Sequence, residues 1–316
     1  MTRLNAAKLT FKALTVGLAV FLTAVGPVNT LVADARESTA TKEDLIPNAP
    51  PLWVWKADGT PKAVVLTLHE LGLHAGAFEN FGERSAKKGI TVYSMDLRGF
   101  GAWRQKDPKQ KMDHDDILSD VKAALEGLHK EYPNTPVFLL GEAMGGATAL
   151  RAAKEFPTLT QGIISSAPGG AHFKTLTNYL TVCHRMFKGP NKRFDYGKEL
   201  VAMGTPKTSL REAYEKDPLV RLDLTPKELM DCQFLMYKTK GMARKIKTQP
   251  VLIVQGEQDK MTKPSSAESI AEKLKTKDKK LMMVSNGDHY VFEDVQVDDK
   301  VMNDTLGWID EHVKAQ

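Results

Sequence analysis

A short glycine-flanked segment has the spacing of a catalytic turn, but its central residue is inert. The segment GEAMGG, residues 141–146, follows the apolar run 137–140 and precedes a helical pattern. Gly-x-Ser-x-Gly between a strand and a helix is the turn that presents a nucleophilic serine. Gly141 and Gly145 occupy the two flanking positions, whereas Ala143 stands where the nucleophile belongs. Because a methyl group cannot attack a carbonyl carbon, this turn by itself predicts no acyl transfer.

Two further residues stand where they could complete a catalytic set with this turn. Asp259 comes shortly after the apolar run 251–254, and His289 comes shortly after the run 281–284. In serine hydrolases with this chain order, the His deprotonates the Ser and the Asp orients and stabilises the imidazolium. Because the carboxyl ends of neighbouring parallel strands share one edge of a sheet, we expect Asp259 and His289 to lie beside Ala143.

A third segment is placed to bind the negative oxygen that forms when an ester is attacked. The loop HELGLH, residues 69–74, follows the apolar run 63–68 at the same predicted edge. We expect the backbone N–H groups of Leu71 and Met144 to be the two donors of an oxyanion hole. Glu70 adds a carboxyl group to this loop. Its charge would oppose the stabilisation of a second negative charge there.

The elements that would position these residues alternate between short apolar runs and helical patterns. Six runs have the length and composition of buried strands: 63–68, 90–95, 137–140, 162–165, 251–254 and 281–284. Apolar residues from Ile117 to Leu128 recur with a 3.6-residue period. Asp113, Asp115 and Asp116 precede them, and we interpret these aspartates as helix-capping residues and not as metal ligands. The alternation predicts an α/β fold with a mostly parallel sheet.

The first 35 residues predict an export signal. Basic residues open the chain, the apolar run 13–28 follows, and Ala33-Asp-Ala35 offers small residues for a cut after Ala35. This is the three-part pattern of a secretory signal peptide, and the apolar run is short for a membrane span of about 20 residues. We therefore expect a periplasmic or secreted protein, with an N-terminal membrane anchor as the alternative. In an oxidising compartment Cys183 and Cys232 could form a disulfide, although two free thiols fit the sequence equally well.

The remaining chain is predicted to form one core interrupted by a cap. Residues 36–51 are polar and Pro-rich and predict a linker, whereas residues 52–170 and 250–316 carry the strand runs of the core. Residues 171–249 lack such a run and predict a helical cap. The cap has 16 Lys and Arg against 8 Asp and Glu, a net charge of +8, while the whole chain has +5. Such a cap could attract anionic headgroups or a membrane surface, or form a solvated basic face.

Composition excludes several broad classes of protein. With 42% hydrophobic and 26% charged residues, the chain has a globular composition, which excludes a disordered or polytopic membrane protein. No nucleic-acid-reading motif accompanies the small positive charge, so a nucleic-acid partner is not expected. The sequence does not indicate an oligomeric state.

Taken together, the motifs resemble the monoacylglycerol lipase and lysophospholipase branch of the α/β hydrolases, a serine aminopeptidase S33-type domain. The resemblance covers roughly residues 50 to 315 and rests on the loop 69–74 and four further segments: Asp96-Leu-Arg-Gly-Phe-Gly101, the turn 141–146, Gly256-Glu-Gln-Asp259 and Gly287-Asp-His289. It implies an eight-stranded, mostly parallel sheet with helices on both faces and a helical cap after the sixth strand. It also implies acyl esters such as monoglycerides or lysophospholipids as substrates, with no metal and no organic cofactor.

Two residues depart from the family pattern, and both fall in the predicted site. Ala143 replaces the nucleophilic Ser, and Glu70 replaces the Gly that usually follows the first His of the loop 69–74. One hypothesis is a lipid-ester hydrolase in which Ala143 is an engineered or compensated replacement; the export signal favours a natural Ala143. The alternative is a non-catalytic pseudohydrolase that binds a small acyl-type ligand in the capped pocket.

Three nearby residues could be suggested as substitute nucleophiles. Ser165 and Ser166 end a predicted strand, and we expect them to face the cap and not the turn. Glu142 precedes the nucleophile position, and we expect its side chain to point away. Direct activation of a water molecule by His289 remains a slow route. Efficient ester hydrolysis is therefore not expected from the chain as written.

Overall fold

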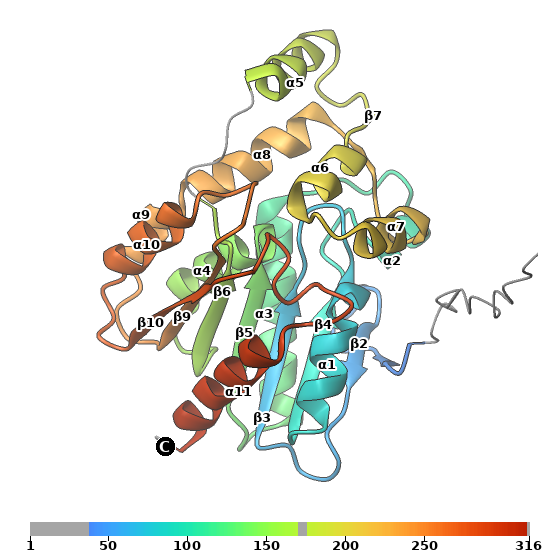
Figure 1. The fold of residues 1–316 in the computed structure, drawn as a ribbon. Helices are drawn as coiled ribbons and strands as arrows, with labels where there is room; N and C mark the ends of the chain where they lie inside the picture. The colour runs from blue at the N-terminus through green and yellow to red at the C-terminus, as the bar shows by residue number, and fades with distance from the viewer. Residues whose placement is uncertain (1–37, 170–175, 315–316) are drawn as a thin grey trace, which may run out of the picture. The chain divides into compact units, whose positions relative to one another are not determined.

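The computed structural model describes residues 38–169 and 176–314, so the predicted signal peptide, residues 1–35, lies outside the described residues. At its centre is an eight-stranded sheet in the order β1-β2-β4-β3-β5-β6-β9-β10 (Figure 1). The strands are β1 (Thr41–Glu43), β2 (Leu52–Trp55), β3 (Ala63–Leu68), β4 (Ile90–Met95), β5 (Val137–Glu142), β6 (Gly162–Ser166), β9 (Val251–Gly256) and β10 (Lys279–Val284). Strands β3 to β10 of this sheet run parallel, while β2 pairs antiparallel with β1 and β4. The predicted α/β fold with an eight-stranded, mostly parallel sheet is confirmed.

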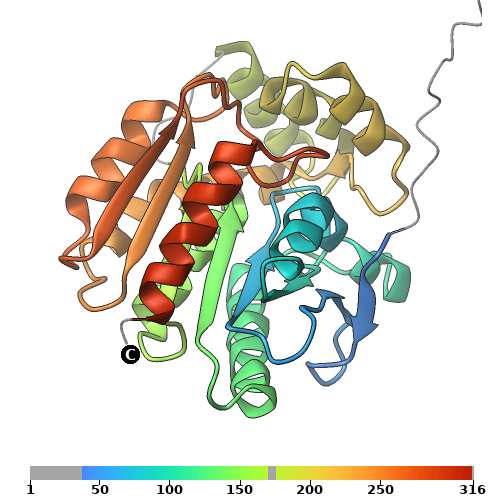
Figure 2. The same ribbon diagram turned by 60° about the horizontal axis from the view of Figure 1, so that its bottom comes forward.

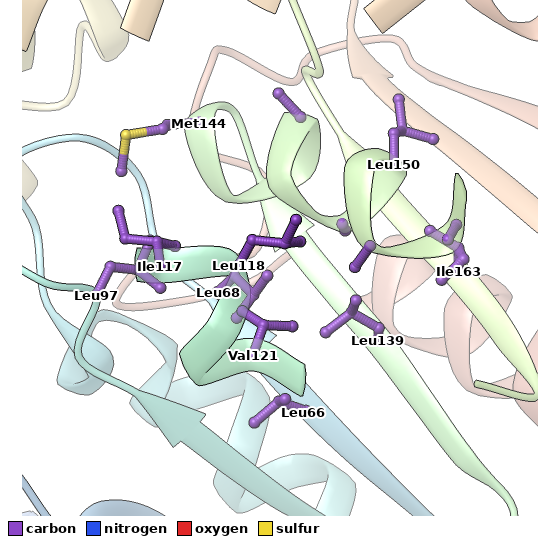
Figure 3. Packing of buried hydrophobic residues seen from close by; sticks show 14 of the residues in the cluster. Leu66, Leu68, Leu97, Ile117, Leu118, Val121, Leu139, Met144, Leu150 and Ile163 are labelled. Carbon is purple, nitrogen blue, oxygen red and sulfur yellow. The ribbon is translucent and has the colours of Figure 1, made fainter. Parts of the chain in front are cut away.

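Helices cover both faces of this sheet. They are α1 (Glu79–Ala86), α2 (Ala102–Lys106), α3 (His114–Glu131), α4 (Met144–Glu155), α10 (Pro264–Lys273) and α11 (Asp299–Val313), with a short 3₁₀ turn at Ala75–Phe78. Because successive strand residues point to opposite faces, Leu66 and Leu68 pack with α3 and α4 in one apolar cluster (Figure 3). Val65 packs in a second cluster with α1 and α11, which lie on the other face (Figure 2).

The start of α3 follows the sequence prediction. The side chain of Asp113 caps the helix by accepting hydrogen bonds from the N–H groups of Asp115 and Asp116 at 2.8 and 3.1 Å. These contacts satisfy backbone donors that the first turn leaves free. Asp113 is therefore the helix cap, and Asp115 and Asp116 lie in the first turn, where the helix dipole favours negative charge. Among the residues that the structure describes, no group of three or more His, Cys, Asp or Glu side chains could hold a metal ion.

The segment predicted as a linker contains one strand. Thr41 to Glu43 form β1 and pair with β2, with Thr41 opposite Val54. The tip of this pair is fixed by the Tyr93 hydroxyl, which donates to Glu43 Oε2 at 2.8 Å. An edge strand needs little apolar surface because its backbone pairing holds it in place. The polar residues 41–43 therefore gave no recognisable strand pattern.

The predicted cap is helical in its described part, residues 176–249. It contains α5 (Leu176–Lys188), α6 (Gly197–Gly204), α7 (Thr208–Lys216), α8 (Pro226–Tyr237), α9 (Thr239–Ala243) and a two-stranded ribbon of β7 (Phe194–Asp195) and β8 (Asp223–Leu224). Helices α5 to α8 lie beyond the carboxyl ends of the parallel strands, with α5 outermost (Figure 1). The cap thus lies over the edge at which the candidate site was predicted.

A buried arginine ties the cap to the core. Arg221 is only 1% exposed, its backbone N–H donates to Gly72 O at 2.7 Å, and its guanidinium donates to Gly99 O at 2.8 Å. The guanidinium also pairs with Glu228 at the start of α8. Because an unpaired buried charge is costly, these partners fix the guanidinium and with it the two loops that it joins.

Two further observations concern the whole described chain. Neither cysteine is paired in the structure: Cys232 is buried and Cys183 is half-buried, and both are free thiols. Within residues 38–169 and 176–314, no helix is long and apolar enough to cross a bilayer.

Candidate active site

The catalytic-type turn has a strained backbone at Ala143. Strand β5 ends at Glu142, α4 begins at Met144, and Ala143 between them has φ 47° and ψ −105°. A residue with a Cβ in this region carries roughly 1–3 kcal/mol of strain. The Ala143 N–H donates to Ser166 O at 2.9 Å, which helps to hold the turn. The turn therefore keeps the conformation that presents a nucleophile, although its side chain is a methyl group.

The two flanking glycines are required by close backbone contacts. A Cβ on Gly141 would lie 2.2 Å from Gly145 O, and a Cβ on Gly145 would lie 1.9 Å from Leu68 O. Neither backbone atom can move away without disturbing a central strand or α4. The glycines predicted to flank the turn are thus explained by packing between β5, α4 and β3.

The structure brings Asp259 and His289 together. Nδ1 of His289 lies 2.8 Å from Asp259 Oδ2, and both side chains are buried. Asp259 follows β9 and is held by further donors: the N–H groups of Met261 and Thr262 at 2.7 and 2.9 Å, the Thr262 hydroxyl at 2.5 Å and the Gln255 amide at 2.8 Å. The carboxylate is therefore fixed by the chain around it and orients the imidazole.

In the Asp259–His289 pair, the charge on each side chain stabilises the charge on the other. Burial alone would raise the pKa of Asp259, but the charge and hydrogen bond of His289, together with Thr262, lower it to about 2. Burial alone would lower the pKa of His289, but Asp259 raises it to about 9. At neutral pH the pair is accordingly a carboxylate and an imidazolium.

The outer nitrogen of His289 is left without a partner. Nδ1 is bonded to Asp259, and Nε2 lies on the other side of the imidazole ring. In an intact catalytic triad this Nε2 bonds the Ser hydroxyl. In the part of the chain that the structure describes, this buried Nε2 has no hydrogen-bond partner. The His289 N–H donates to Gly204 O of the cap at 3.0 Å, so the backbone of this residue is also fixed.

Glu70 occupies the place predicted for the oxyanion. The Met144 N–H donates to Glu70 Oε2 at 2.8 Å, and the Leu71 N–H also favours the charged form of this carboxyl. Both donors expected from the sequence therefore converge on a side chain of the protein. Burial raises the pKa of Glu70 to about 7, while the charge of His289 and the two N–H groups oppose that rise. Near neutral pH the hole thus already holds a partly ionised carboxyl group.

The backbone of Glu70 is held on both sides. Its N–H donates to Glu293 Oε1 at 2.9 Å, and its carbonyl oxygen accepts from His69 Nδ1 at 2.7 Å. His69 accepts from the Leu97 N–H at 2.9 Å through Nε2, so Nδ1 carries the proton. Burial lowers the pKa of His69 to about 4, which keeps the ring neutral. His69 is therefore a brace for the oxyanion loop.

The two serines at the end of β6 are not oriented as the sequence prediction had them. We expected Ser165 and Ser166 to face the cap, but Ser165 Oγ donates to Gly146 O at 2.9 Å and Ser166 Oγ donates to Glu142 Oε1 at 2.7 Å. Both hydroxyls thus point toward the two sides of the turn. Because each hydrogen is committed to a buried acceptor, neither serine is placed as a substitute nucleophile.

Glu142 ties the turn to the loop that carries His289. Its carboxyl oxygens accept from the N–H groups of Val291, Phe292 and Glu293 at 2.9, 2.9 and 2.7 Å. The side chain points away from the position of a substrate, as the sequence analysis expected. Its role in the structure is to hold the two halves of the site at a fixed spacing.

Sequence reasoning missed Glu293, which supports the oxyanion loop. Its Oε1 accepts from Glu70 N–H, and its buried Oε2 has no partner among the described residues. Burial raises the pKa of Glu293 well above its ordinary value. No local pattern around residue 293 signals this contact, because the two residues are 223 positions apart.

The motif 96–101 has the structural role that we expected. Asp96 accepts from the N–H groups of Ala75 and Ala102, both at 2.8 Å, and so joins two loops at the edge of the sheet. Arg98 pairs with Asp120 of α3 at 2.6 Å. These contacts brace the loop that follows β4 and do not place either side chain at position 143.

Comparison with known proteins decides the family. The model of the family described as "Serine aminopeptidase, S33" matches residues 59–296. The chain belongs to this family. Among curated relatives, monoglyceride lipase of Mus musculus is 26% identical over 267 residues, which cover 83% of this chain and 86% of the relative. Monoacylglycerol lipase of Mycolicibacterium smegmatis is 23% identical and covers 82% of this chain and 92% of the relative.

Solved structures of other proteins have the same fold as this chain. A soluble variant of monoglyceride lipase from Saccharomyces cerevisiae, crystallised with a substrate analogue, has a TM-score of 0.72 at 21% identity and covers 88% of this chain and 98% of its own. The monoacylglycerol lipase of Paleococcus ferrophilus has a TM-score of 0.66 at 24% identity and covers 83% and 99%. The α/β-hydrolase fold of this chain is therefore that of the monoglyceride lipases.

Proposed function

We propose that this protein is a non-catalytic member of the monoglyceride lipase group that binds an acyl-type, lipid-like ligand under its cap. The observation that carries the proposal is Ala143 at the apex of the strained turn. Acyl transfer in this family depends on a hydroxyl at that apex, and loss of the nucleophile typically lowers kcat about a millionfold. The fold around the position is retained, which fits a protein that still accommodates a ligand of the family's type.

Glu70 supports the same proposal independently. An oxyanion hole stabilises the transition state because its donors are free to bond a developing negative charge. Here the Met144 N–H is already bonded to Glu70. Restoring a nucleophile at position 143 would therefore leave the oxyanion hole occupied by Glu70.

A second candidate function is slow ester hydrolysis by water. The retained Asp259–His289 pair and the unpartnered Nε2 of His289 favour it, since a water molecule at that nitrogen could be deprotonated. The protonated state of His289 limits this route, because an imidazolium cannot act as a base. Hydrolysis of this kind would increase as the pH rises toward about 9, the pKa of His289.

Ester turnover tests the two candidates. Wild type, Ala143→Ser and His289→Gln are compared on short- and medium-chain aryl esters across this pH range, with Glu311→Gln as a control at an exposed position. We expect wild type at the buffer background and a measurable gain for Ala143→Ser. Turnover by wild type that rises with pH and disappears in His289→Gln would support the second candidate and contradict the first.

Ligand binding is tested separately by displacement of a fluorescent fatty-acyl probe. We expect saturable binding to wild type with one site per chain. Binding that is absent, or that is equal in the presence of excess medium-chain monoglyceride, would contradict a binding function even if no ester were hydrolysed.

Location and membrane contact are also proposed. Residues 1–35 support export with a cut after Ala35, to be tested by N-terminal sequencing of the protein recovered outside the cytoplasm.

On α5, Leu180 and Phe187 are 57% and 92% exposed and lie near the basic Arg185 and Lys188. This combination favours contact with an anionic membrane. Replacing both apolar residues by Ser should release the protein from anionic vesicles.

A further inference from the structure

The candidate site contains a buried donor and a buried acceptor that do not bond each other. Nε2 of His289 is unpartnered, and the Glu70 carboxyl lies close enough for the two charges to influence each other's pKa. No hydrogen bond or ion pair joins the two groups in the described chain. Both lie beside the turn: Glu70 bonds the N–H of Met144, and the loop that carries His289 is bonded to Glu142 through the N–H of Val291.

The two groups define what can lie between them. His289 is held as an imidazolium by Asp259 and offers an N–H, whereas ionised Glu70 offers only acceptors. Of the other carboxyls near Glu70, that of Glu142 accepts backbone hydrogen bonds through both oxygens. Glu293 accepts the Glu70 N–H through Oε1 and keeps Oε2 without a partner in the described chain. A group between His289 and Glu70 must accept one hydrogen bond and donate another. A hydroxyl does both, a carboxylate only accepts, and an ammonium only donates.

We propose that the site binds a neutral amphiphile by its hydroxyl group, which accepts a hydrogen bond from His289 Nε2 and donates one to Glu70. The inference rests on the proposed binding function and names the chemical class of the ligand. The ligand hydroxyl takes the place of the serine hydroxyl that Ala143 lacks. Free long-chain alcohols and partial glycerides share this chemistry.

The surroundings suit an alkyl chain attached to such a hydroxyl. Cys232, Leu235 and Met236 of the cap helix α8 pack in the same apolar cluster as Ala143 and Met144. Burial and the charge of Glu70 raise the pKa of the Cys232 thiol, so this side chain of the cap lies near the polar pair. An alkyl chain of the ligand would contact these apolar side chains whatever its headgroup. His289 and Glu70 therefore decide which headgroup is accepted.

A series of C8 amphiphiles with matched chains tests the inference. Octan-1-ol, octanoate and octylammonium are titrated into wild type by calorimetry near pH 8, between the pKa of about 7 for Glu70 and about 9 for His289. We expect octan-1-ol to bind at least about tenfold more tightly than either ion, because each ion leaves one buried group unpaired. A medium-chain monoglyceride, measured in parallel, distinguishes a glyceride from a free alcohol as the better source of the hydroxyl.

Three variants probe the predicted contacts. Ala143→Ser should weaken binding of octan-1-ol about tenfold, because its own hydroxyl fills the same space. Glu70→Gly frees the N–H groups of Leu71 and Met144 and should reverse the preference in favour of octanoate. Glu70→Gln keeps the shape without the charge and should lose the discrimination against octanoate. Glu311→Gln, an exposed position, should change none of these affinities.

The outcomes separate this inference from the proposed function. Equal affinities, or a preference of wild type for octanoate, would overturn the hydroxyl site while leaving a binding function in place. Binding of none of the amphiphiles would contradict the binding function itself. Thermal unfolding of each variant is measured alongside, and if Glu70→Gly is unfolded, loss of discrimination in Glu70→Gln decides the question alone.

Discussion

The two sides of the candidate site depart from the family pattern to different extents. On one side, Asp259 and His289 keep the hydrogen bond and the buried charges of a catalytic pair. On the other side, Ala143 has no nucleophile and Glu70 fills the hole in which an oxyanion would be bound. The backbone between the two sides keeps its catalytic-type form: the turn is strained at Ala143, and its glycines pack closely against α4 and β3.

This difference shows which parts of a catalytic site the fold itself maintains. Asp259 accepts several hydrogen bonds from its own loop, so its loss would leave those donors unpaired in the interior. Position 143 carries no such contacts beyond its backbone, and Ala fits there without disturbing its neighbours. The side chain of Asp259 is thus part of the folded structure of its loop, whereas the side chain at position 143 makes no hydrogen bond that a change would break.

The largest expected effect comes from reversing both changes on the altered side. Ala143→Ser with Glu70→Gly should hydrolyse medium-chain aryl esters at least about a hundredfold faster than Ala143→Ser alone, because an oxyanion donor is worth about 10²–10³ in kcat. The measurement is kcat under saturating ester. Glu70→Gly alone is the control and should stay at background, since it has no nucleophile. Equal rates for the single Ser and double variants would show that Glu70 does not obstruct the hole.

A change in the shared backbone should lower stability. Gly145→Ala places a Cβ 1.9 Å from Leu68 O and should lower the free energy of unfolding by about 4 kcal/mol or more. Urea denaturation measures this loss. Gly307→Ala is a matched control in α11, where a Cβ meets nothing within 4 Å, and it should raise stability by up to about 1 kcal/mol. Similar effects of the two substitutions would refute the packing account of the turn.

The carboxyl in the hole should make stability depend on pH. The pKa of Glu70 is raised from 4.5 to about 7, so its contribution to stability is present below pH 4.5 and is lost as the pH rises through about 7. Relative to wild type, Glu70→Gln should therefore gain on the order of 3 kcal/mol between pH 4.5 and 8. Urea midpoints at the two pH values test this. Glu311→Gln should show no comparable gain, and a pH-independent difference for Glu70→Gln would contradict the burial of an ionised carboxyl.

The smallest expected effect concerns the strain at position 143. Ala143→Gly should raise the free energy of unfolding by about 1 kcal/mol, because glycine adopts a φ of 47° without the clash of a Cβ. Ala147→Gly in the first half of α4 should instead lower it by at least about 1 kcal/mol. If Ala143→Gly were as destabilising as Ala147→Gly, the turn would not be strained.

The central sheet and the positions of the site residues could be predicted from the sequence for definite reasons. Strands buried on both faces leave continuous apolar runs, and all six predicted runs lie within strands. The polar strand β1 left no such run, because backbone pairing with β2 holds it. Asp259 and His289 were expected together because the carboxyl ends of parallel strands converge on one edge.

The finer contacts could not be predicted, because they depend on side-chain direction and on distant partners. The sequence showed that Glu70 departs from the family pattern, but not that its carboxyl would reach the Met144 N–H at 2.8 Å. It gave the wrong direction for Ser165 and Ser166, which lie on opposite faces of β6 and bond different sides of the turn. Glu293 left no signal at all, because its partner is remote in sequence.

Glu142 has a consequence for how rigidly the two halves of the site are joined. Its carboxyl binds three successive amides, those of Val291, Phe292 and Glu293, and its own backbone belongs to β5. These amides should exchange with deuterated solvent as slowly as those of the central strands, although they lie in a loop. The loop of residues 291–293 is thereby fixed to the end of β5, so the spacing between His289 and the turn stays constant.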